Sequence, residues 1–222
     1  MGRRHDPIFQ SREQPMTRDV TLIIGTKRFS SWSLRPWLAA HVAGLNVAEV
    51  DIVLRQPETK ANILKHSPSG KVPCLIHDGL VVWDSLAICE YLAETFPEAG
   101  LWPDDRAARA IARAVSAEMH SGFPALRNAC SMDMCAHTPM REIPDDVAVE
   151  IRRISALWDD CRARFGAGGP FLFGRFSVAD AMYAPVVSRF TTYDLPLNEN
   201  GRAYCAAIWG LPAMQAWKAA SV

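Results

Sequence analysis

One stretch, residues 67–95, constrains the fold more than any other part of the chain. Its sequence is SPSGKVPCLIHDGLVVWDSLAICEYLAET, with one short apolar run at 72–76 and a second at 80–83. Asp78-Gly79, which stands between the two runs, is typical of a tight β-hairpin. Apolar residues then recur at helical spacing from Leu86 to Phe96. The stretch therefore predicts a strand, a turn, a second strand and a helix.

Two features of this stretch point to a ligand as well as to packing. Pro73 stands where a strand begins, although a proline removes a hydrogen-bond donor from the ladder. A cis bond before it would expose the backbone of Val72 to an extended peptide. Asp84-Ser85 places a hydroxyl and free N–H groups at a helix start, where a carboxylate binds well. The alternative at both places is ordinary structure, a plain hairpin and an N-cap.

Composition narrows the class of protein. The 222 residues are 49% hydrophobic, which allows one or two domains with a full core. Lys+Arg and Asp+Glu number 24 each, so no net charge favours nucleic acid or an anionic membrane as a partner. The six cysteines show no CxxC or zinc spacing and predict buried thiols in a reducing compartment, without a metal. No apolar run approaches the ~20 residues of a membrane span. We therefore expect a cytoplasmic protein.

The order of strand and helix signals divides the chain. Residues 20–24 and 47–54 predict two parallel strands joined by a helix at about 33–43. Together with the opening stretch they give a mixed sheet with helices on its faces. A proline-rich break follows, and strand signals nearly vanish after it. We expect a loose extension at 1–19, an α/β domain at 20–97, a linker at 98–104 and an all-helical domain at 105–222.

Helical patterns fill the C-terminal part of the chain. One helix is expected from Asp104 to about Met134, kinked at Gly122-Phe123-Pro124 because Pro124 frees a carbonyl one turn back. A second is expected from Asp145 to Phe165. Ser177-Val178-Ala179-Asp180 matches a capping box and starts a third, with Ser177 as its cap. This last motif is a folding signal and carries no catalysis.

Three motifs in this order resemble the glutathione transferase family, and the resemblance covers roughly residues 20–219. The motifs are Phe29-Ser30-Ser31-Trp32-Ser33, Lys71-Val72-Pro73 with Asp84-Ser85, and Gly174-Arg175-Phe176-Ser177-Val178-Ala179-Asp180. The resemblance implies a thioredoxin-like N-terminal domain that binds glutathione as co-substrate. It also implies a C-terminal all-helical bundle that holds the electrophile, and a homodimer.

The resemblance assigns roles in glutathione binding residue by residue. The backbone of Val72 would pair with the cysteinyl part of glutathione, beside a cis Pro73. Ser85, with its own N–H, would hold the γ-glutamyl carboxylate, and Asp84 would face the ammonium end. Lys71 would lie near the glycyl end.

The first motif would carry the chemistry. Ser30-Ser31-Trp32-Ser33 is similar to the SSCS pattern of the zeta class, with Trp32 in place of the cysteine. In that class the first serine hydrogen-bonds the sulfur of glutathione. Ser30 is therefore the first choice for the catalytic serine and Ser31 the second. Ser33 looks like the helix cap. A free thiol has a pKa of ~8.5, so little of it is ionised at neutral pH. A hydroxyl that donates to the sulfur would favour the thiolate, and the N-terminus of the following helix would add to this effect. Turn and capping chemistry is the alternative for serines in a loop.

The acceptor pocket is expected between this loop and the kinked helix. Trp32 would form an aromatic wall, and His120 is a candidate on the helix, for which a solvated or hydrogen-bonded bystander is the alternative. Met119, Phe123 and Arg127 are further candidates, although Met and Phe at helical spacing are usually core residues.

Three functions stay open at this point. The first is transfer of glutathione to small apolar electrophiles, a detoxification reaction. The second is a glutathione-dependent isomerase of the maleylacetoacetate type, and the third is a non-catalytic protein with the same fold. Because positions 30–33 hold no cysteine, disulfide exchange through the enzyme's own thiol is disfavoured.

Overall fold

A computed structural model describes residues 17–222, and its strands form one mixed sheet. The strands β1 (Asp19–Gly25), β2 (Asn46–Ile52), β3 (Cys74–His77) and β4 (Leu80–Trp83) take the order β2-β1-β3-β4. β1 and β2 are parallel, and β3 is antiparallel to both β1 and β4. Asp78 and Gly79 have φ values of 48° and 80°, as a tight hairpin turn requires. The predicted sheet and hairpin are confirmed.

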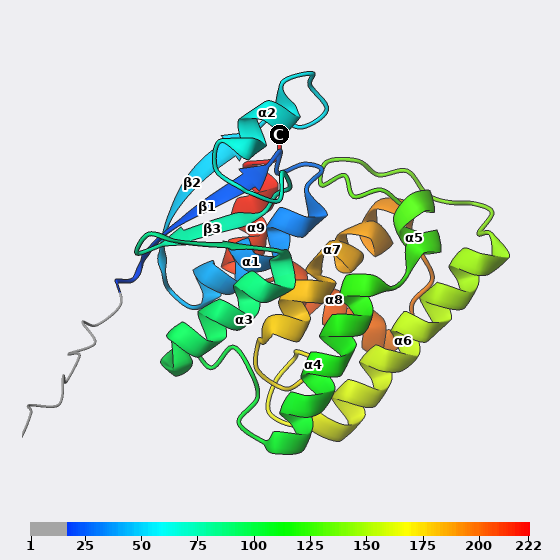
Figure 1. Ribbon diagram of the computed structural model, residues 1–222. Coiled ribbons are helices and arrows are strands. Elements are labelled where there is room, and N and C mark those ends of the chain that lie inside the picture. The colour runs from blue at the N-terminus through cyan, green and yellow to red at the C-terminus, as the bar shows by residue number, and fades with distance from the viewer. Residues whose placement is uncertain (1–16) are drawn as a thin grey trace, which may run out of the picture.

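Helices cover both faces of the sheet. Alternate residues of β1 point to opposite sides, so each face carries apolar side chains that a helix must bury. α1 (Ser31–Val42) and α3 (Ser85–Thr95) pack against each other on the face that carries Leu22 and Ile24. α2 (Thr59–Leu64) covers the other face, where Ile63 meets Ile23. This thioredoxin-like domain lies on one side of the molecule (Figure 1).

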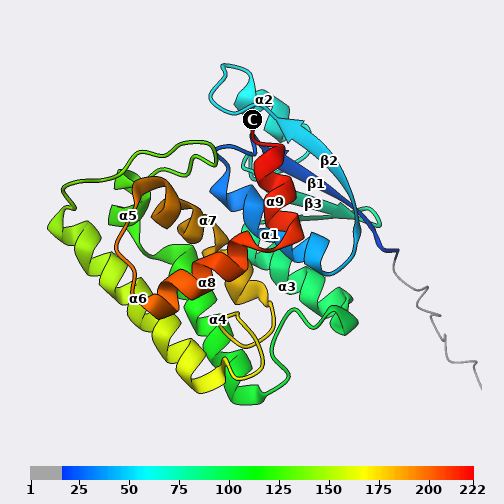
Figure 2. The same ribbon diagram turned by 180° about the vertical axis from the view of Figure 1, so that it is seen from behind.

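The C-terminal domain is helical and is built around α7. Its helices are α4 (Arg106–Ser121), α5 (Pro124–Ala129), α6 (Asp145–Phe165), α7 (Val178–Tyr193), α8 (Glu199–Trp209) and α9 (Pro212–Ala219). Residues on every side of α7 are buried, and this helix packs on α1, α4 and α8. The chain then returns to the first domain, because α9 lies beside α1 (Figure 2).

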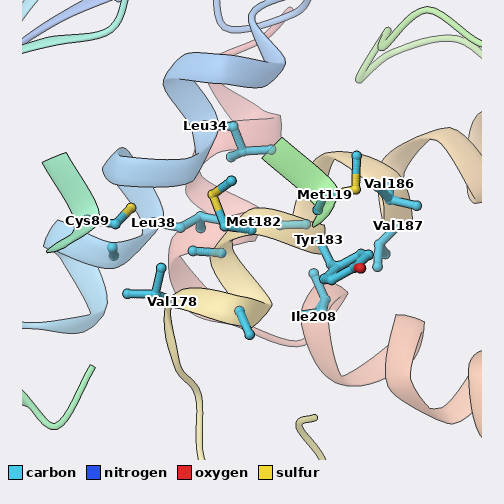
Figure 3. Close-up of a cluster of buried hydrophobic side chains, with 14 of the residues drawn as sticks. Leu34, Leu38, Cys89, Met119, Val178, Met182, Tyr183, Val186, Val187 and Ile208 are labelled. Atoms are coloured by element: carbon cyan, nitrogen blue, oxygen red, sulfur yellow. The ribbon is translucent and has the colours of Figure 1, made fainter. Parts of the chain in front are cut away.

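One apolar core joins the two domains. Leu34 and Leu38 from α1 meet Met119 from α4 and Met182 from α7 in a cluster of fully buried side chains (Figure 3). Truncating a buried leucine in such a core costs ~2–5 kcal/mol. The shared core therefore fixes the position of α1 relative to α4, and these helices carry Trp32 and His120 of the cleft described below.

Two expectations about helix boundaries are wrong, and the first concerns the helix that follows the linker. The single helix from Asp104 to Met134 is in fact α4 and α5, separated at Gly122 and Phe123. Phe123 has a φ of 60°, in the left-handed region, so the chain breaks there and does not merely kink. Pro124 takes the first position of α5, where its missing N–H does no harm.

The second wrong expectation is the cap of the first helix. α1 starts at Ser31, and the cap is Ser30, whose hydroxyl accepts from the N–H of Ser33 at 3.4 Å. Ser33 lies inside the helix, where its oxygen accepts from the N–H of Gly25 at 3.1 Å. The third motif behaves as predicted, because Asp180 accepts from the N–H of Ser177 at 2.8 Å at the start of α7.

The predicted extension at 1–19 lies mostly outside the described residues. Asp19 already belongs to β1, and Thr17 bonds to Asp78 in the hairpin turn through its hydroxyl, at 3.1 Å. Across residues 17–222, every helix is too short or too polar to cross a membrane.

Candidate active site

A cleft of about 570 Å³ opens between the thioredoxin-like domain and α4. Its volume lies within the ~300–1,000 Å³ typical of small-molecule sites. Seven of the residues predicted from the sequence line it, whereas Ser30, Ser31 and the further candidates Met119, Phe123 and Arg127 do not. The lining residues are Trp32, Ser69, Lys71, Val72, Pro73, Trp83, Asp84, Ser85 and His120. The sequence analysis missed Ser69 and Trp83, which flank two of the motifs and carry no separate signal.

The proline motif forms one wall of this cleft. The bond between Val72 and Pro73 is cis, as predicted. The strand registers of β3 begin at Cys74, so the backbone of Val72 stands outside the ladder and on the cleft wall. Lys71, the neighbouring residue, adds a cation to the same wall.

Asp84 and Ser85 open α3, and they play different parts there. Asp84 is the N-cap, since its carboxylate accepts from the N–H of Leu86 at 2.9 Å and of Ala87 at 3.3 Å. Ser85 is 1% exposed, and its hydroxyl has no hydrogen-bond partner among residues 17–222. Leaving a buried hydroxyl unpaired costs ~1–3 kcal/mol. An acceptor group on a ligand in the cleft, such as a carboxylate, would remove that cost.

A hydrogen bond joins Asp84 and His120, which both line the cleft. His120 Nε2 lies 2.8 Å from Asp84 Oδ2 and joins α4 to the start of α3. Partial burial raises the pKa of Asp84, but the hydrogen bonds from His120 and from the α3 N–H groups outweigh it. The net pKa of Asp84 therefore lies below its usual value, and the cleft wall carries a negative charge near Ser85.

The two serines predicted to be catalytic lie at the start of α1, next to Trp32. Ser30 and Ser31 are buried, at 5% and 8% exposure, and neither lines the cleft. The Ser30 hydroxyl donates to the oxygen of Ser33 at 2.7 Å. To donate to a ligand sulfur instead, this hydroxyl must rotate away from Ser33, while the helix N-terminus keeps its orientation.

Trp32 separates the cleft from a buried arginine. Its ring makes an edge contact with His120, with centroids 5.3 Å apart, and the guanidinium carbon of Arg35 lies 4.2 Å from its centroid. The sequence analysis missed Arg35. The only signal was a single charge within the apolar run of α1. Met119 and Phe123 are buried core residues, which confirms the packing alternative for both.

Comparisons with known proteins agree with this arrangement. Family models described as the N-terminal and C-terminal domains of glutathione S-transferase match residues 29–95 and 138–219. Glutathione S-transferase L3 from Arabidopsis thaliana is 26% identical over 218 residues, which are 96% of this chain and 83% of that protein. A probable maleylacetoacetate isomerase from Caenorhabditis elegans is 40% identical over 98 residues, 44% of this chain and 45% of that protein.

Solved structures show the same fold. A glutathione transferase from Methylococcus capsulatus is similar with a TM-score of 0.66 and 26% identity, covering 91% of this chain and 98% of that one. A glutathione transferase homolog from Burkholderia, solved with bound glutathione, has a TM-score of 0.68 and 23% identity, covering 90% and 95%. Both domain models, the full-length relative and the fold agree, and the chain belongs to the glutathione S-transferase family.

Proposed function

We propose that the protein is a glutathione transferase that binds glutathione in the cleft and activates its thiol for attack on a small electrophile. The observation that carries the proposal is the buried hydroxyl of Ser85, which is unpaired within the described residues and lines the same cleft as Val72 and Lys71. That cleft offers a donor for one carboxylate, a free backbone for an extended peptide and a cation for a second carboxylate. Glutathione needs all of these.

The binding mode follows from these groups. The γ-glutamyl carboxylate accepts from Ser85, and its ammonium group faces the ionised Asp84. The cysteinyl backbone pairs with Val72, which directs the sulfur toward the start of α1. The glycyl carboxylate lies near Lys71.

Ser30 is the residue that we propose to contact the sulfur. Its hydroxyl turns from Ser33 toward the thiolate, and the N-terminus of α1 adds a partial positive charge. Lowering the thiol pKa by ~2 units needs ~2.7 kcal/mol, within reach of one charge-assisted hydrogen bond and the helix dipole. The thiol proton passes to solvent, the sulfur forms a bond to the electrophilic carbon, and the leaving group departs with its electron pair.

The likeness to a probable maleylacetoacetate isomerase favours one second candidate. In that reaction the thiolate adds to a conjugated cis double bond, and its electrons move to the adjacent carbonyl oxygen as an enolate. The former double bond rotates, the enolate re-forms it in the trans arrangement, and the thiolate is released. Glutathione is unchanged overall.

Two measurements test these proposals. Binding to immobilised glutathione, with elution by free glutathione, is expected for both enzymes; a protein that passes through is neither. Turnover of chlorodinitrobenzene with loss of glutathione supports the transferase, whereas isomerisation of maleylacetone without loss of glutathione supports the isomerase. A protein that binds glutathione but turns over neither compound would be a binding protein.

A further inference from the structure

Asp84 and His120 join the two domains at the cleft, and the binding mode proposed above uses only the first of them. His120 belongs to the last turn of α4, and Asp84 caps the start of α3. Among the described residues that line the cleft, Asp84 carries the only carboxylate. The ammonium group of a bound glutathione therefore finds its counter-charge in this cleft at Asp84.

The hydrogen bonds of Asp84 leave room for a ligand at one of its oxygens. Oδ1 accepts from the N–H groups of Leu86 and Ala87 at 2.9 and 3.3 Å, and it lies 2.9 Å from His120 Nε2. Oδ2 lies 2.8 Å from the same nitrogen and accepts from no other group within residues 17–222. A carboxylate oxygen accepts more than one hydrogen bond. Because the Asp84 side chain is 44% exposed, a second donor can reach Oδ2.

The pair keeps a negative charge for such a donor. Burial raises the pKa of Asp84, but the hydrogen bonds from His120 and from the α3 N–H groups bring it below its usual value, so the carboxylate is ionised at neutral pH. An ionised carboxylate can only accept, and His120 Nε2 must therefore carry a hydrogen atom and donate it. In its neutral form His120 does so without adding a positive charge, which leaves the charge of Asp84 to attract an ammonium group.

The backbone of Asp84 is strained, and His120 helps to hold it. Its φ of 77° lies in the left-handed region, which is costly for a residue with a side chain and persists only where the surroundings over-determine it. The ring of His120 is itself fixed by an edge contact with Trp32, with centroids 5.3 Å apart. Met119, the preceding residue of α4, lies in the core that both domains share. The helical domain thus holds the Asp84 carboxylate from outside α3.

We propose that His120 is a positioning residue for glutathione, which holds Asp84 Oδ2 toward the cleft so that this oxygen binds the α-ammonium group of the γ-glutamyl residue. This inference rests on the proposed function and gives the helical domain a part in recognising glutathione. The alternative is that His120 occupies the place of the ammonium group and must leave when glutathione binds. The remaining acceptor site on Oδ2 favours the first arrangement, because both donors can bind the same oxygen.

A matched pair of ligands tests the proposal. Glutathione and its deamino analogue, in which a hydrogen atom replaces the α-amino group, share the thiol and both carboxylates. The wild-type protein should bind glutathione more tightly. In His120→Leu, we expect the calorimetric affinity for glutathione to fall about 5- to 10-fold, because the ammonium contact is weakened but not removed. The affinity for the deamino analogue should change by less than about twofold.

Rescue and coupling separate positioning from a role in the fold. His120→Gln should restore most of the loss, since the Gln amide nitrogen lies as many bonds from Cβ as His Nε2 and also donates a hydrogen bond. In an Asp84→Asn background, His120→Leu should change the glutathione affinity by less than about twofold, because both residues act through one contact.

His41→Leu is the matched control. His41 also lies in the last turn of its helix, and its ring stacks on that of Trp37, but it does not line the cleft. This variant should keep the wild-type affinity for both ligands. Thermal unfolding of each variant shows whether the fold is kept.

Nitrogen NMR of the isotope-labelled wild-type protein decides the matter if His120→Leu does not fold. The signal that disappears in His120→Gln identifies the ring of His120. Its Nε2 should carry a hydrogen atom in the free protein and keep it when glutathione binds. Loss of that hydrogen atom on binding would mean that His120 leaves Asp84, and would refute the inference.

Several affinities would also overturn the inference. In His120→Leu, an unchanged affinity for glutathione or equal losses for both ligands would exclude positioning of the ammonium contact. A higher affinity for glutathione in this variant would show that His120 competes with the ammonium group. Wild-type protein that binds both ligands equally tightly would refute the inference alone, whereas wild-type protein that binds neither would refute the proposed function.

Discussion

Replacing Ser85 by alanine should change stability and glutathione affinity in opposite directions. The Ser85 hydroxyl is buried and finds no hydrogen-bond partner in the part of the chain that the structure describes, and such a group costs ~1–3 kcal/mol. Ser85→Ala removes this cost, so the free energy of unfolding without ligand should rise by about 1 kcal/mol. The same change deletes a hydrogen bond to a charged carboxylate, worth ~1.5–3 kcal/mol. Glutathione affinity should therefore fall by about 10- to 150-fold.

Urea unfolding and isothermal calorimetry measure the two effects separately. Ser116→Ala is the control, because Ser116 is also a buried helical serine but its hydroxyl donates to the carbonyl of Ala112 at 2.7 Å. This variant should lose stability, by up to ~1.5 kcal/mol, and keep its glutathione affinity. If Ser85→Ala instead lowers stability while glutathione affinity is unchanged, the hydroxyl has a structural partner and the reasoning is refuted.

Three further predictions concern the sulfur contact, the pH dependence of stability and the oligomeric state. Ser30→Ala should lower turnover about 10- to 100-fold and keep the glutathione affinity within a few-fold of wild type. Ser31→Ala should turn over substrate at a rate near that of wild type. The reverse pattern would assign the sulfur contact to Ser31. Because the folded-state pKa of Asp84 is lowered, its ionised form stabilises the fold above about pH 4, and this contribution is lost as the pH falls through the folded pKa. The stability difference between wild type and Asp84→Asn, from urea unfolding, should therefore shrink on acidification; a constant difference would contradict the assignment. Sedimentation equilibrium should show the homodimer that the family resemblance implies, and a monomer would contradict it.

The parts of the site that depend on local sequence could be predicted. A turn at Asp78-Gly79, a proline at the start of a strand and Asp84-Ser85 at a helix start each act through the backbone of their immediate neighbours. Their positions therefore followed from the order of residues, and the cleft brings the second motif together with Trp32 of the first.

Features set by contacts between distant segments could not be predicted. Arg35 is buried close enough to Arg127 and Arg189 for their charges to act on it, and the sequence shows each only as one charge on a helix. The chain break at Phe123 depends on tertiary packing, since a buried phenylalanine side chain holds a left-handed backbone there. Ser30 and Ser33 lie three residues apart, and the sequence allows either of them to cap α1. In the structure the Ser33 oxygen accepts from the N–H of Gly25, and the cap is Ser30.

The most direct test of the account is a titration of the thiol of bound glutathione. The ultraviolet absorbance of the thiolate, followed against pH in the enzyme complex, gives the pKa of the sulfur in the cleft. The account predicts a pKa about 2 units below the ~8.5 of a free thiol, and a return toward the free value in Ser30→Ala. A bound thiol that titrates like free glutathione in the wild-type protein would contradict the claim that the start of α1 activates the sulfur.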